Sequence, residues 1–475
     1  MGRFTEYENH DALGLAELIR HGQVSAAEVL EEAIERTDAR NPVLNAVVTR
    51  TYEAARARAT QPLPDSPIAG VPFLIKDLTY VAGVPSTSGS RLYAANVPDH
   101  DATVVSRYRT AGLLVYGKTN TPEFGLNVTT EPALFGPTRN PWNPQYTSGG
   151  SSGGASAAVA DGWLPVAHAT DGGGSIRIPA SCCGLVGLKP SRARNPTGPD
   201  SGEGWGGMST GHVVSRTVRD SAAFLDATHG PAPGDPYCAP QFDGSYLDQH
   251  KGPPGKLRIA IDLQSITGVA PHKECVRAVE IAAQLCVGLG HAVEHASPQF
   301  DRQRFGAATS TLVASNIAHT VHSRCAQLGR ELQANDIEPH TLYFAQLGRQ
   351  VTGEDYARSM QVIHQAGRAL ATFHERFDIM IAPVLVSPPI PIGWLDTCGY
   401  NAAEFNERFL QFWGYTNLQN ATGQPAISLP LHWSADGLPV GVQFVGPVGS
   451  ELLLLQLARQ LEEAQPWFDR RPARA

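Results

Sequence analysis

The chain has few cysteines, no long apolar run and no long basic run. Its seven cysteines in 475 residues form no CxxC pair, which favours reduced thiols over a disulfide framework. No apolar run approaches 18 residues, so no membrane-spanning helix is expected. The net charge of −8, without a basic run, argues against a nucleic-acid partner. The first residues also lack the pattern of a signal peptide, so we expect a cytoplasmic protein.

Motifs for metals, nucleotides and hydrolase elbows do not fit this chain. It has no HExxH motif and no paired-cysteine knuckle, so we expect neither a metal nor another cofactor. Residues 112–119 (GLLVYGKT) match a phosphate-loop pattern, but their apolar middle predicts a strand. Residues 149–153 (GGSSG) match the elbow G-x-S-x-G, which needs a strand directly before it, whereas residues 140–145 (NPWNPQ) predict a loop.

Glycine, by contrast, is concentrated around two serines. Residues 148–156 read SGGSSGGAS, and residues 171–179 read DGGGSIRIP. Glycine costs backbone entropy on folding, so such density needs a reason. One reason is a backbone that approaches a reacting atom and presents its N–H groups, which is typical of a nucleophile beside an oxyanion hole. The simpler alternative is a tight turn before a helix, with Pro179 near its first turn.

The apolar pattern predicts alternating strands and helices. Ser25–Glu28 forms a capping box before a helical stripe, and residues 451–464 predict an amphipathic helix. Short apolar runs between helical stretches predict strands of an α/β sheet that is buried on both faces. The predicted strands are Pro72–Ile75, Leu113–Tyr116, Leu164–Ala167, Leu257–Leu263 and Ile379–Ala382.

Several stretches carry a resemblance to a known family. They are residues 68–78 (IAGVPFLIKDL), 117–124 (GKTNTPEF), 148–156, 171–190, 423–430 (GQPAISLP) and 437–443 (GLPVGVQ). In their order and spacing they resemble the amidase signature family, whose members cleave C–N bonds with a Ser–Ser–Lys triad. The resemblance implies an α/β fold in which helices sandwich a central, twisted, mixed β-sheet (α/β/α). We expect one domain over residues 1–475, with a catalytic core at 68–225 and a variable substrate-pocket region at 300–415.

The resemblance also implies the catalytic roles. Ser175 is expected to be the nucleophile, Lys76 the general base and Ser151 the bridging serine, with a cis peptide bond before Ser151. A lysine acts as a base only if burial or neighbouring charge lowers its pKa. Lys76 follows the apolar run Phe73–Ile75, which would carry its amine into the interior.

An oxyanion hole is expected just before Ser175. Gly172, Gly173 and Gly174 offer consecutive N–H groups for the negative oxygen of the intermediate. The family usually has a threonine where this chain has Gly172. That departure makes the loop more flexible and puts in doubt any hydrogen bond of the threonine side chain, but it leaves the backbone donors in place.

Six neighbouring residues are expected to have supporting or structural roles. Ser152 should hydrogen-bond the serine loop, and Asp171 and Arg177 should pair to support the nucleophile loop. His168 is interpreted as a core or loop histidine rather than a base. Cys182–Cys183 are interpreted as buried helix thiols.

Residues 300–415 match the family least and are rich in aromatics. We expect most of these side chains in the core and a few along the substrate pocket. They are Tyr343, Phe344, Trp394, Phe405, Phe409, Phe412, Trp413 and Tyr415.

One branch of the family is especially similar to this chain. Residues 129–132 (TTEP), 138–142 (TRNPW) and 177–181 (RIPAS) resemble the bacterial hydrolases of cyclic nylon dimers (aminohexanoate type). This implies a stand-alone hydrolase of small, fairly apolar amides, including anilides, nylon-type oligomers and carbamates (urethanes), with esters as a side activity. Its only partner would be the small-molecule substrate, and a homo-oligomeric state stays open.

Two other functions compete with this one. A glutamine amidotransferase subunit would act on aminoacyl-tRNA within a multi-subunit complex and would need a charged pocket. The aromatic residues near 405–415 favour an apolar pocket instead. A non-catalytic binding module on the same fold is disfavoured by the intact Lys76, Ser151 and Ser175.

Overall fold

The computed structural model describes residue 4 and residues 6–473. Its largest sheet has eight strands in the spatial order β10 (Ala292–His295), β9 (Arg258–Ile261), β11 (Ile379–Pro383), β13 (Pro439–Val445), β12 (Ala426–Trp433), β7 (Val186–Lys189), β8 (Thr210–Ser215) and β6 (Val166–Asp171). A three-stranded sheet has the order β1 (Val47–Arg50), β3 (Leu114–Thr119) and β2 (Pro72–Lys76). A two-stranded hairpin pairs β4 (Arg139–Asn140) with β5 (Asn143–Thr147).

The eight-stranded sheet is mixed. β10 and β11 run parallel to β9, whereas the neighbouring strands from β11 to β6 pair antiparallel. β2 lies beside the edge strand β6, where the backbone N–H of Lys76 donates to Nδ1 of His168 at 3.4 Å. The ends of β2 and β6 therefore meet, and the predicted base is brought close to the loop that follows β6.

Helices make up much of the rest of the chain. They are α1 (Ala12–Arg20), α2 (Ala26–Leu44), α3 (Tyr52–Ala59), α4 (Thr103–Thr110), α5 (Gly153–Ala160), α6 (Arg177–Cys183), α7 (Val218–Thr228), α8 (Tyr246–Gln249), α9 (Lys273–Gly288), α10 (Arg302–Gln327), α11 (Pro339–Gln350), α12 (Gly353–Arg376), α13 (Ala402–Phe412), α14 (Asn417–Thr422) and α15 (Glu451–Ala464). Short 3-10 turns lie at Tyr7–Asn9, Arg91–Tyr93 and Glu123–Gly125. No helix in the described part of the chain is long and apolar enough to cross a membrane.

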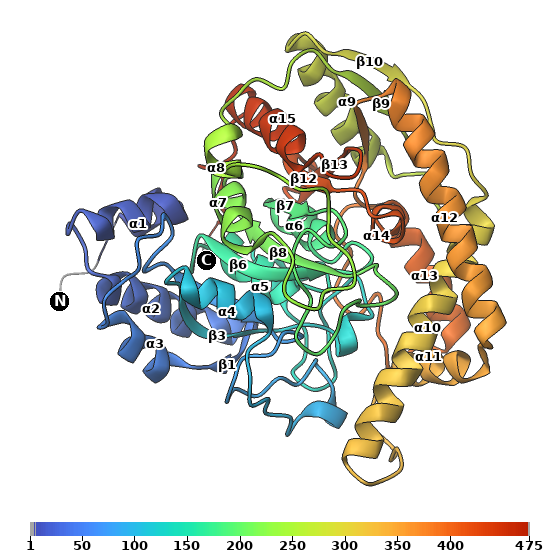
Figure 1. Cartoon of the computed structure of the whole chain (residues 1–475), viewed down its shortest axis with the longest axis horizontal. Coiled ribbons are helices and arrows are strands. Elements are labelled where there is room, and N and C mark those ends of the chain that lie inside the picture. Colours follow the sequence, from blue (N-terminus) through green and yellow to red (C-terminus); the bar gives the residue numbers. More distant parts are fainter. Residues whose placement is uncertain (1–3, 5, 474–475) are drawn as a thin grey trace.

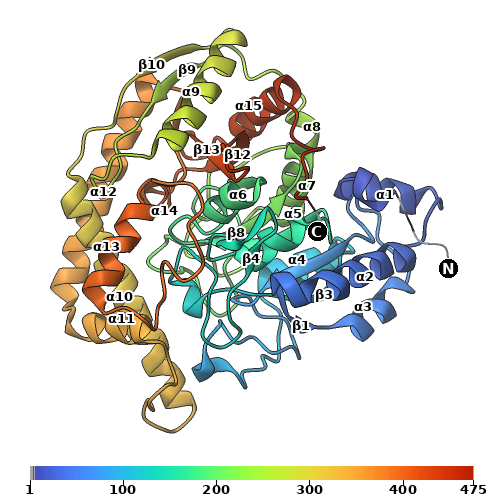
Figure 2. The same cartoon turned by 180° about the vertical axis from the view of Figure 1, so that it is seen from behind.

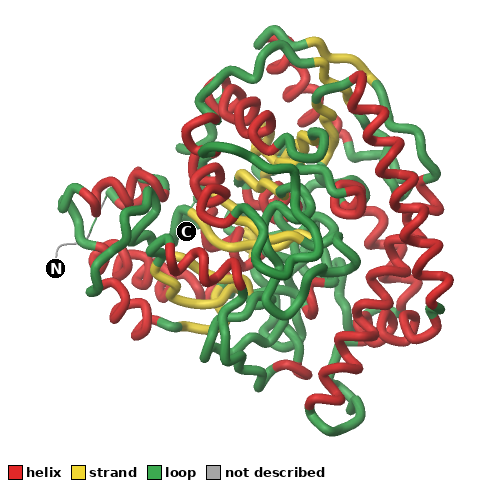
Figure 3. The backbone as a smooth tube through the Cα atoms, in the orientation of Figure 1, coloured by secondary structure: helices red, strands yellow, loops and turns green. Residues whose placement is uncertain are grey.

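The alternation of residues along β13 shows that helices cover both faces of the sheet. Val442 and Phe444 belong to a hydrophobic cluster with side chains from α9 and α15. Gly441 and Gln443 face the opposite way and contact Ser181 and Arg177 of α6. Because successive strand residues point to opposite faces, this pattern defines a three-layer α/β/α arrangement, as the sequence predicts (Figure 3).

A group of long helices stands at one side of the sheet. α10 packs against both α11 and α12, and α13 lies next to them in both views (Figures 1 and 2). These helices come from residues 300–415, the region expected to vary and to form the substrate pocket. The N-terminal helices α1–α3 lie at the opposite side of the molecule.

Most of the predicted elements are present, with one correction. Strands occur at all five predicted positions, α15 spans the predicted residues 451–464, and Ser25 and Glu28 form the reciprocal capping box. Six of the residues 112–119, Leu114–Thr119, form β3, so the segment that matches the phosphate-loop pattern is mainly a strand, as predicted. The prediction of a loop at residues 140–145 is wrong, since they lie in the β4–β5 hairpin. That hairpin is separate from the main sheet, and its Asn and Pro residues gave only turn signals.

The close approach of α6 to β13 can be tested at Gly441. A Cβ at this position would lie 2.6 Å from Ser428 Oγ and 2.8 Å from the backbone Cα of Ser181. We therefore expect Gly441→Ala to lower the free energy of unfolding by about 1–3 kcal/mol, measured by denaturant titration. Gly288→Ala, at the end of α9 where no atom lies within 4 Å of the added methyl, is the control and should not destabilise the protein.

Candidate active site

The end of β2 places the amine of Lys76 in the interior, among three hydroxyl groups. Its Nζ lies 2.7 Å from Ser151 Oγ, 2.9 Å from Ser152 Oγ and 3.0 Å from Thr170 Oγ1. The side chain is fully buried, and burial lowers the pKa of Lys76 well below its ordinary value, against a smaller opposing effect of the Asp171 charge. A neutral amine has two N–H donors and one lone pair, which three hydroxyl groups can satisfy.

The serine loop before α5 is pressed against neighbouring backbone. The peptide bond between Gly150 and Ser151 is cis, as the family resemblance implies. A Cβ on Gly150 would lie 2.5 Å from the carbonyl oxygen of Thr129, and one on Gly125 would lie 3.1 Å from Ser151 Oγ. Glycine is thus needed here because other chain segments approach within contact distance, and the bridging serine is held from both sides.

Ser152 has a more direct role than the sequence predicts. Its hydroxyl exchanges hydrogen bonds with the backbone of Thr170 in β6, at 3.2 and 3.3 Å, rather than with the serine loop as expected. It also lies within hydrogen-bond distance of the Lys76 amine. Thr170 supplies the third hydroxyl group at the Lys76 amine, and sequence reasoning missed it. Its position next to Asp171 at the end of β6 was the signal that could have identified it.

Asp171 shapes the loop that carries Ser175. Its carboxylate accepts the N–H groups of Gly174 at 2.7 Å and Ile176 at 3.1 Å, and it pairs with Arg177 through two contacts of 2.9 and 3.0 Å. Burial alone would raise the pKa of Asp171, but the Arg177 guanidinium outweighs it and holds that pKa well below its usual range. The predicted Asp171–Arg177 pair is therefore present and supports the loop.

Arg177 connects this loop to the far end of the chain. Its guanidinium is fully buried and donates to Gln443 Oε1 and Asn420 Oδ1, each at 2.6 Å, and to Gln419 Oε1 at 3.2 Å. Sequence reasoning missed these three partners. Gln443 lies in the family-like stretch 437–443, which was the one sign of its role.

The backbone N–H groups of residues 172–175 differ in whether they are free to bind an oxyanion. Gly172 and Gly173 are half-buried, and their N–H groups have no partner within the described residues. The N–H of Gly174 is buried and bound to Asp171, so it is not free for an oxyanion as the sequence analysis expected. The N–H of Ser175 has no partner in the described chain either and could take its place.

Ser175 lies at the wall of a cavity of about 440 Å³. The residue is 8% exposed, and its hydroxyl makes no hydrogen bond within the described chain. Trp205 lines this cavity. Five of the eight aromatics singled out in the sequence also line it, which is more than expected: Tyr343, Phe344, Phe405, Phe409 and Trp413. Trp413 also donates its indole N–H to the carbonyl oxygen of Gly173 at 3.0 Å. The cavity is thus mainly apolar and open to the predicted nucleophile.

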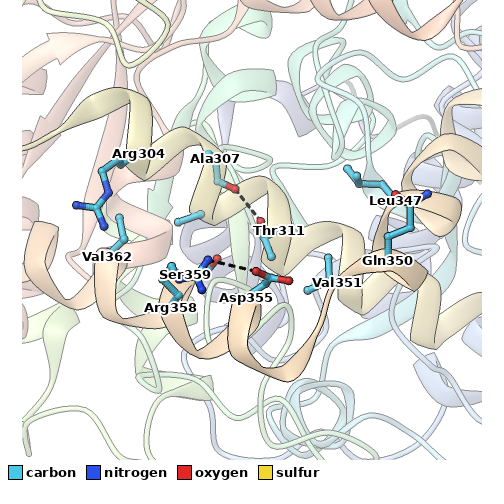
Figure 4. A pocket seen from close by; sticks show the side chains of 11 residues that line it. Arg304, Ala307, Thr311, Leu347, Gln350, Val351, Asp355, Arg358, Ser359 and Val362 are labelled. Carbon is cyan, nitrogen blue, oxygen red and sulfur yellow. Dashed lines mark hydrogen bonds and ion pairs between the residues drawn. The ribbon is translucent and has the colours of Figure 1, made fainter.

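A second cavity, of about 320 Å³, lies among α10, α11 and α12 (Figure 4). Its charged side chains include Arg304, Asp355 and Arg358, and the last two form an ion pair at 3.3 Å. None of the predicted catalytic residues borders it. The cavity beside Ser175, by contrast, combines the predicted nucleophile with backbone N–H groups that are free within the described residues.

His168 and the two cysteines act as structural residues. His168 is buried in β6, and burial lowers its pKa to about 3. Its Nδ1 accepts the Lys76 N–H while its Nε2 has no partner in the described structure, so it is only half satisfied. Cys182 and Cys183 are buried in α6, where burial raises both thiol pKa values, as predicted.

Comparison with known proteins decides the family. The model of the family described as Amidase matches residues 28–455. The chain belongs to the amidase family. Its fold is the amidase signature fold, and the protein is a hydrolase of that family acting on amides.

The most similar proteins include enzymes named for amide substrates. A 6-aminohexanoate-cyclic-dimer hydrolase from Paenarthrobacter ureafaciens is 42% identical, over 97% of this chain and 96% of its own. An acylamidase from Rhodococcus erythropolis is 34% identical, over 99% and 98%. The solved structure of a 6-aminohexanoate cyclic dimer hydrolase complexed with substrate has a TM-score of 0.92 and 39% identity, covering 98% of this amidase and 99% of that chain.

The Asp171–Arg177 pair generates a stability prediction. Asp171→Asn leaves Arg177 buried without its counter-charge, so the free energy of unfolding at pH 7 should fall by about 3–5 kcal/mol. The folded pKa of Asp171 lies below the unfolded value of about 3.9, so its stabilisation is present above that pH and is lost on acidification. Urea titrations from pH 3 to pH 7 should therefore show a weaker acid dependence in the variant. Asp436→Asn, in an exposed turn, is the control and should match the wild type at every pH.

Proposed function

We propose that this amidase hydrolyses small, fairly apolar amides through a Ser175 acyl-enzyme. The observation that supports it best is the 2.7 Å contact between the buried Lys76 amine and Ser151, beside a cavity that exposes Ser175. An amide needs an activated nucleophile, donors for the oxyanion and an acid for the departing nitrogen. The residues around this cavity can supply all three.

The proton moves along Ser175, Ser151 and Lys76. Neutral Lys76 takes the proton of Ser151, which takes that of Ser175 as its Oγ forms a bond to the substrate carbonyl carbon. The protonated lysine then returns a proton through Ser151 to the leaving nitrogen, and the C–N bond breaks. Water attacks the acyl-enzyme with the same groups acting as base, and the acid is released.

The negative oxygen of the intermediate would be bound by backbone donors. The N–H groups of Gly172, Gly173 and Ser175 are free in the described structure, whereas Gly174 is bound to Asp171 and holds the loop in shape. Losing one oxyanion donor typically costs about 10²–10³-fold in turnover. The rigid loop is therefore part of the catalytic machinery.

The cavity supports apolar substrates over amino-acid substrates. Its wall is mostly aromatic and aliphatic, and burial lowers the pKa of His340 to about 4, which keeps that side chain neutral. Arg302 is the one lining residue in the described chain that carries a charge at neutral pH. Nylon-type oligomers, anilides and carbamates fit this lining, and esters should react as a side activity because their leaving group departs more easily. Glutamine would leave its ammonium group without a carboxylate partner, which disfavours the amidotransferase alternative.

Ser175→Ala tests the nucleophile. With hexanoyl p-nitroanilide or a phenyl carbamate, the isolated wild-type chain should release amine, and the variant should lose at least about 10³-fold in kcat. Mass spectrometry of quenched wild type should show the hexanoyl group on Ser175. Ser156→Ala is the matched control, because the hydroxyl of this buried α5 serine has no hydrogen-bond partner within the described residues, so activity should persist. Amine release that survives Ser175→Ala would reject the assignment, and hydrolysis of glutamine but of neither probe would favour the amidotransferase function.

The lowered pKa of Lys76 predicts the pH profile. Because the base must be neutral, kcat/KM should fall on the acid side as Lys76 gains a proton, with a midpoint well below the ordinary lysine pKa of about 10.4. Lys76→Arg, which keeps its charge across the whole profile, should lose about 10²–10⁴-fold throughout. An acid-side midpoint near 10.4 would contradict a neutral buried base.

A further inference from the structure

The indole of Trp205 occupies the space above Gly172. A Cβ on Gly172 would lie 2.9 Å from Cε3 and 3.1 Å from Cζ3 of that ring. Any side chain larger than that of glycine at this position would overlap the indole. The glycine at 172 and the tryptophan at 205 are therefore sterically linked. The absence of a side chain on Gly172 leaves the space that the indole of Trp205 occupies, next to the proposed oxyanion donor of Gly172.

Trp205 is held in place from the outside of the cavity. It has a left-handed backbone, with φ of 53°, which a bulky residue rarely adopts. Next to it, a Cβ on Gly206 would lie 2.9 Å from Leu312 Cδ2 of α10 and 2.9 Å from Tyr356 Oη of α12. The indole therefore packs between the oxyanion loop and the long helices, as expected for a fixed wall of the cavity.

Trp205 packs on the same hydrophobic cluster as a segment that approaches Ser151. It packs against the hydrophobic cluster that contains Phe124, together with Leu126. Between these two residues lies Gly125, whose added Cβ would be 3.1 Å from Ser151 Oγ. Ser151 delivers the proton to the leaving nitrogen, so this side of the cavity receives the amine.

Trp413 contacts the loop at a different residue from Trp205. It packs against a different cluster, which contains Ile178 and Phe405, and it holds the carbonyl oxygen of Gly173. The two indoles therefore border the same cavity from different clusters of the core. A carbonyl bound at the oxyanion loop would have its amine toward Trp205 and its acyl chain toward Trp413.

We propose that Trp205 determines specificity for the leaving amine. Its indole stacks on flat aromatic amines, such as anilines, and excludes amines with bulk outside the ring plane, and Gly172 is the residue that allows it to do so. This inference rests on the proposed hydrolysis through Ser175. It concerns which amides the enzyme prefers and leaves the proposed reaction steps unchanged.

Two substrate series separate the amine side from the acyl side. The amine series compares hexananilide with its ortho-tert-butyl derivative, and the acyl series compares the anilides of hexanoic and 2-ethylhexanoic acids. Trp205→Ala should lower the preference for the flat amine, as a ratio of kcat/KM values, at least about ten-fold, while the acyl ratio changes less than about three-fold. Ratios within one variant do not depend on how much of it is folded.

Gly172 variants test the steric link. Gly172→Ala should shift the amine ratio in the presence of Trp205, because the new methyl displaces the indole, and should add no further shift in the Trp205→Ala background. Gly173→Ala is the matched control for a stiffer loop, since no atom lies within 4 Å of its added methyl. The change in the amine ratio that Gly173→Ala causes should be the same in the wild-type and Trp205→Ala backgrounds.

The outcomes distinguish the two proposals. Wild type that releases amine, with an amine ratio unaltered by Trp205→Ala, overturns the role of Trp205 and leaves the amidase mechanism intact. An acyl ratio that responds in place of the amine ratio also overturns it. No release from any anilide by wild type overturns the proposed function and the specificity role together.

Discussion

The burial of one amine, that of Lys76, is the condition on which the site depends. A lysine in water is a cation and cannot take a proton, but desolvation at the end of β2 lowers its pKa and leaves a lone pair. Ser151, Ser152 and Thr170 surround the amine with hydroxyl groups, which satisfy it without adding charge. A carboxylate at any of these positions would restore the ammonium ion and remove the base.

The second constraint is the shape of the nucleophile loop, which one carboxylate imposes. Asp171 binds two loop N–H groups and the guanidinium of Arg177, so Gly172 and Gly173 are left with free donors. A buried ion pair contributes little to stability unless its remaining donors are satisfied, and here side-chain oxygens of α14 and β13 satisfy them. The pair therefore fixes the geometry of the loop and also stabilises the fold.

Local pattern was enough to predict a sheet buried on both faces and its principal strands, because these depend on short stretches with fixed spacing. The expected roles of Lys76, Ser151 and Ser175 came from the resemblance to the family. Prediction failed where contacts between distant segments decide the outcome. The engaged N–H of Gly174 depends on how the loop folds back on Asp171. The partners Gln419 and Gln443 lie more than 240 residues from Arg177 along the chain. The substitution at Gly172 was visible in the sequence, but its reason, the indole of Trp205, was not.

The network around Arg177 has a consequence for synthesis of the protein. Every residue proposed to act on the substrate carbonyl has been translated once Ser175 is added, yet the loop that holds Ser175 is anchored to Gln419, Asn420 and Gln443. A chain emerging from the ribosome would thus contain the full catalytic set long before that set could be arranged. Activity would begin only when β13 enters the sheet, so chains terminated early would bear an intact signature but no working enzyme.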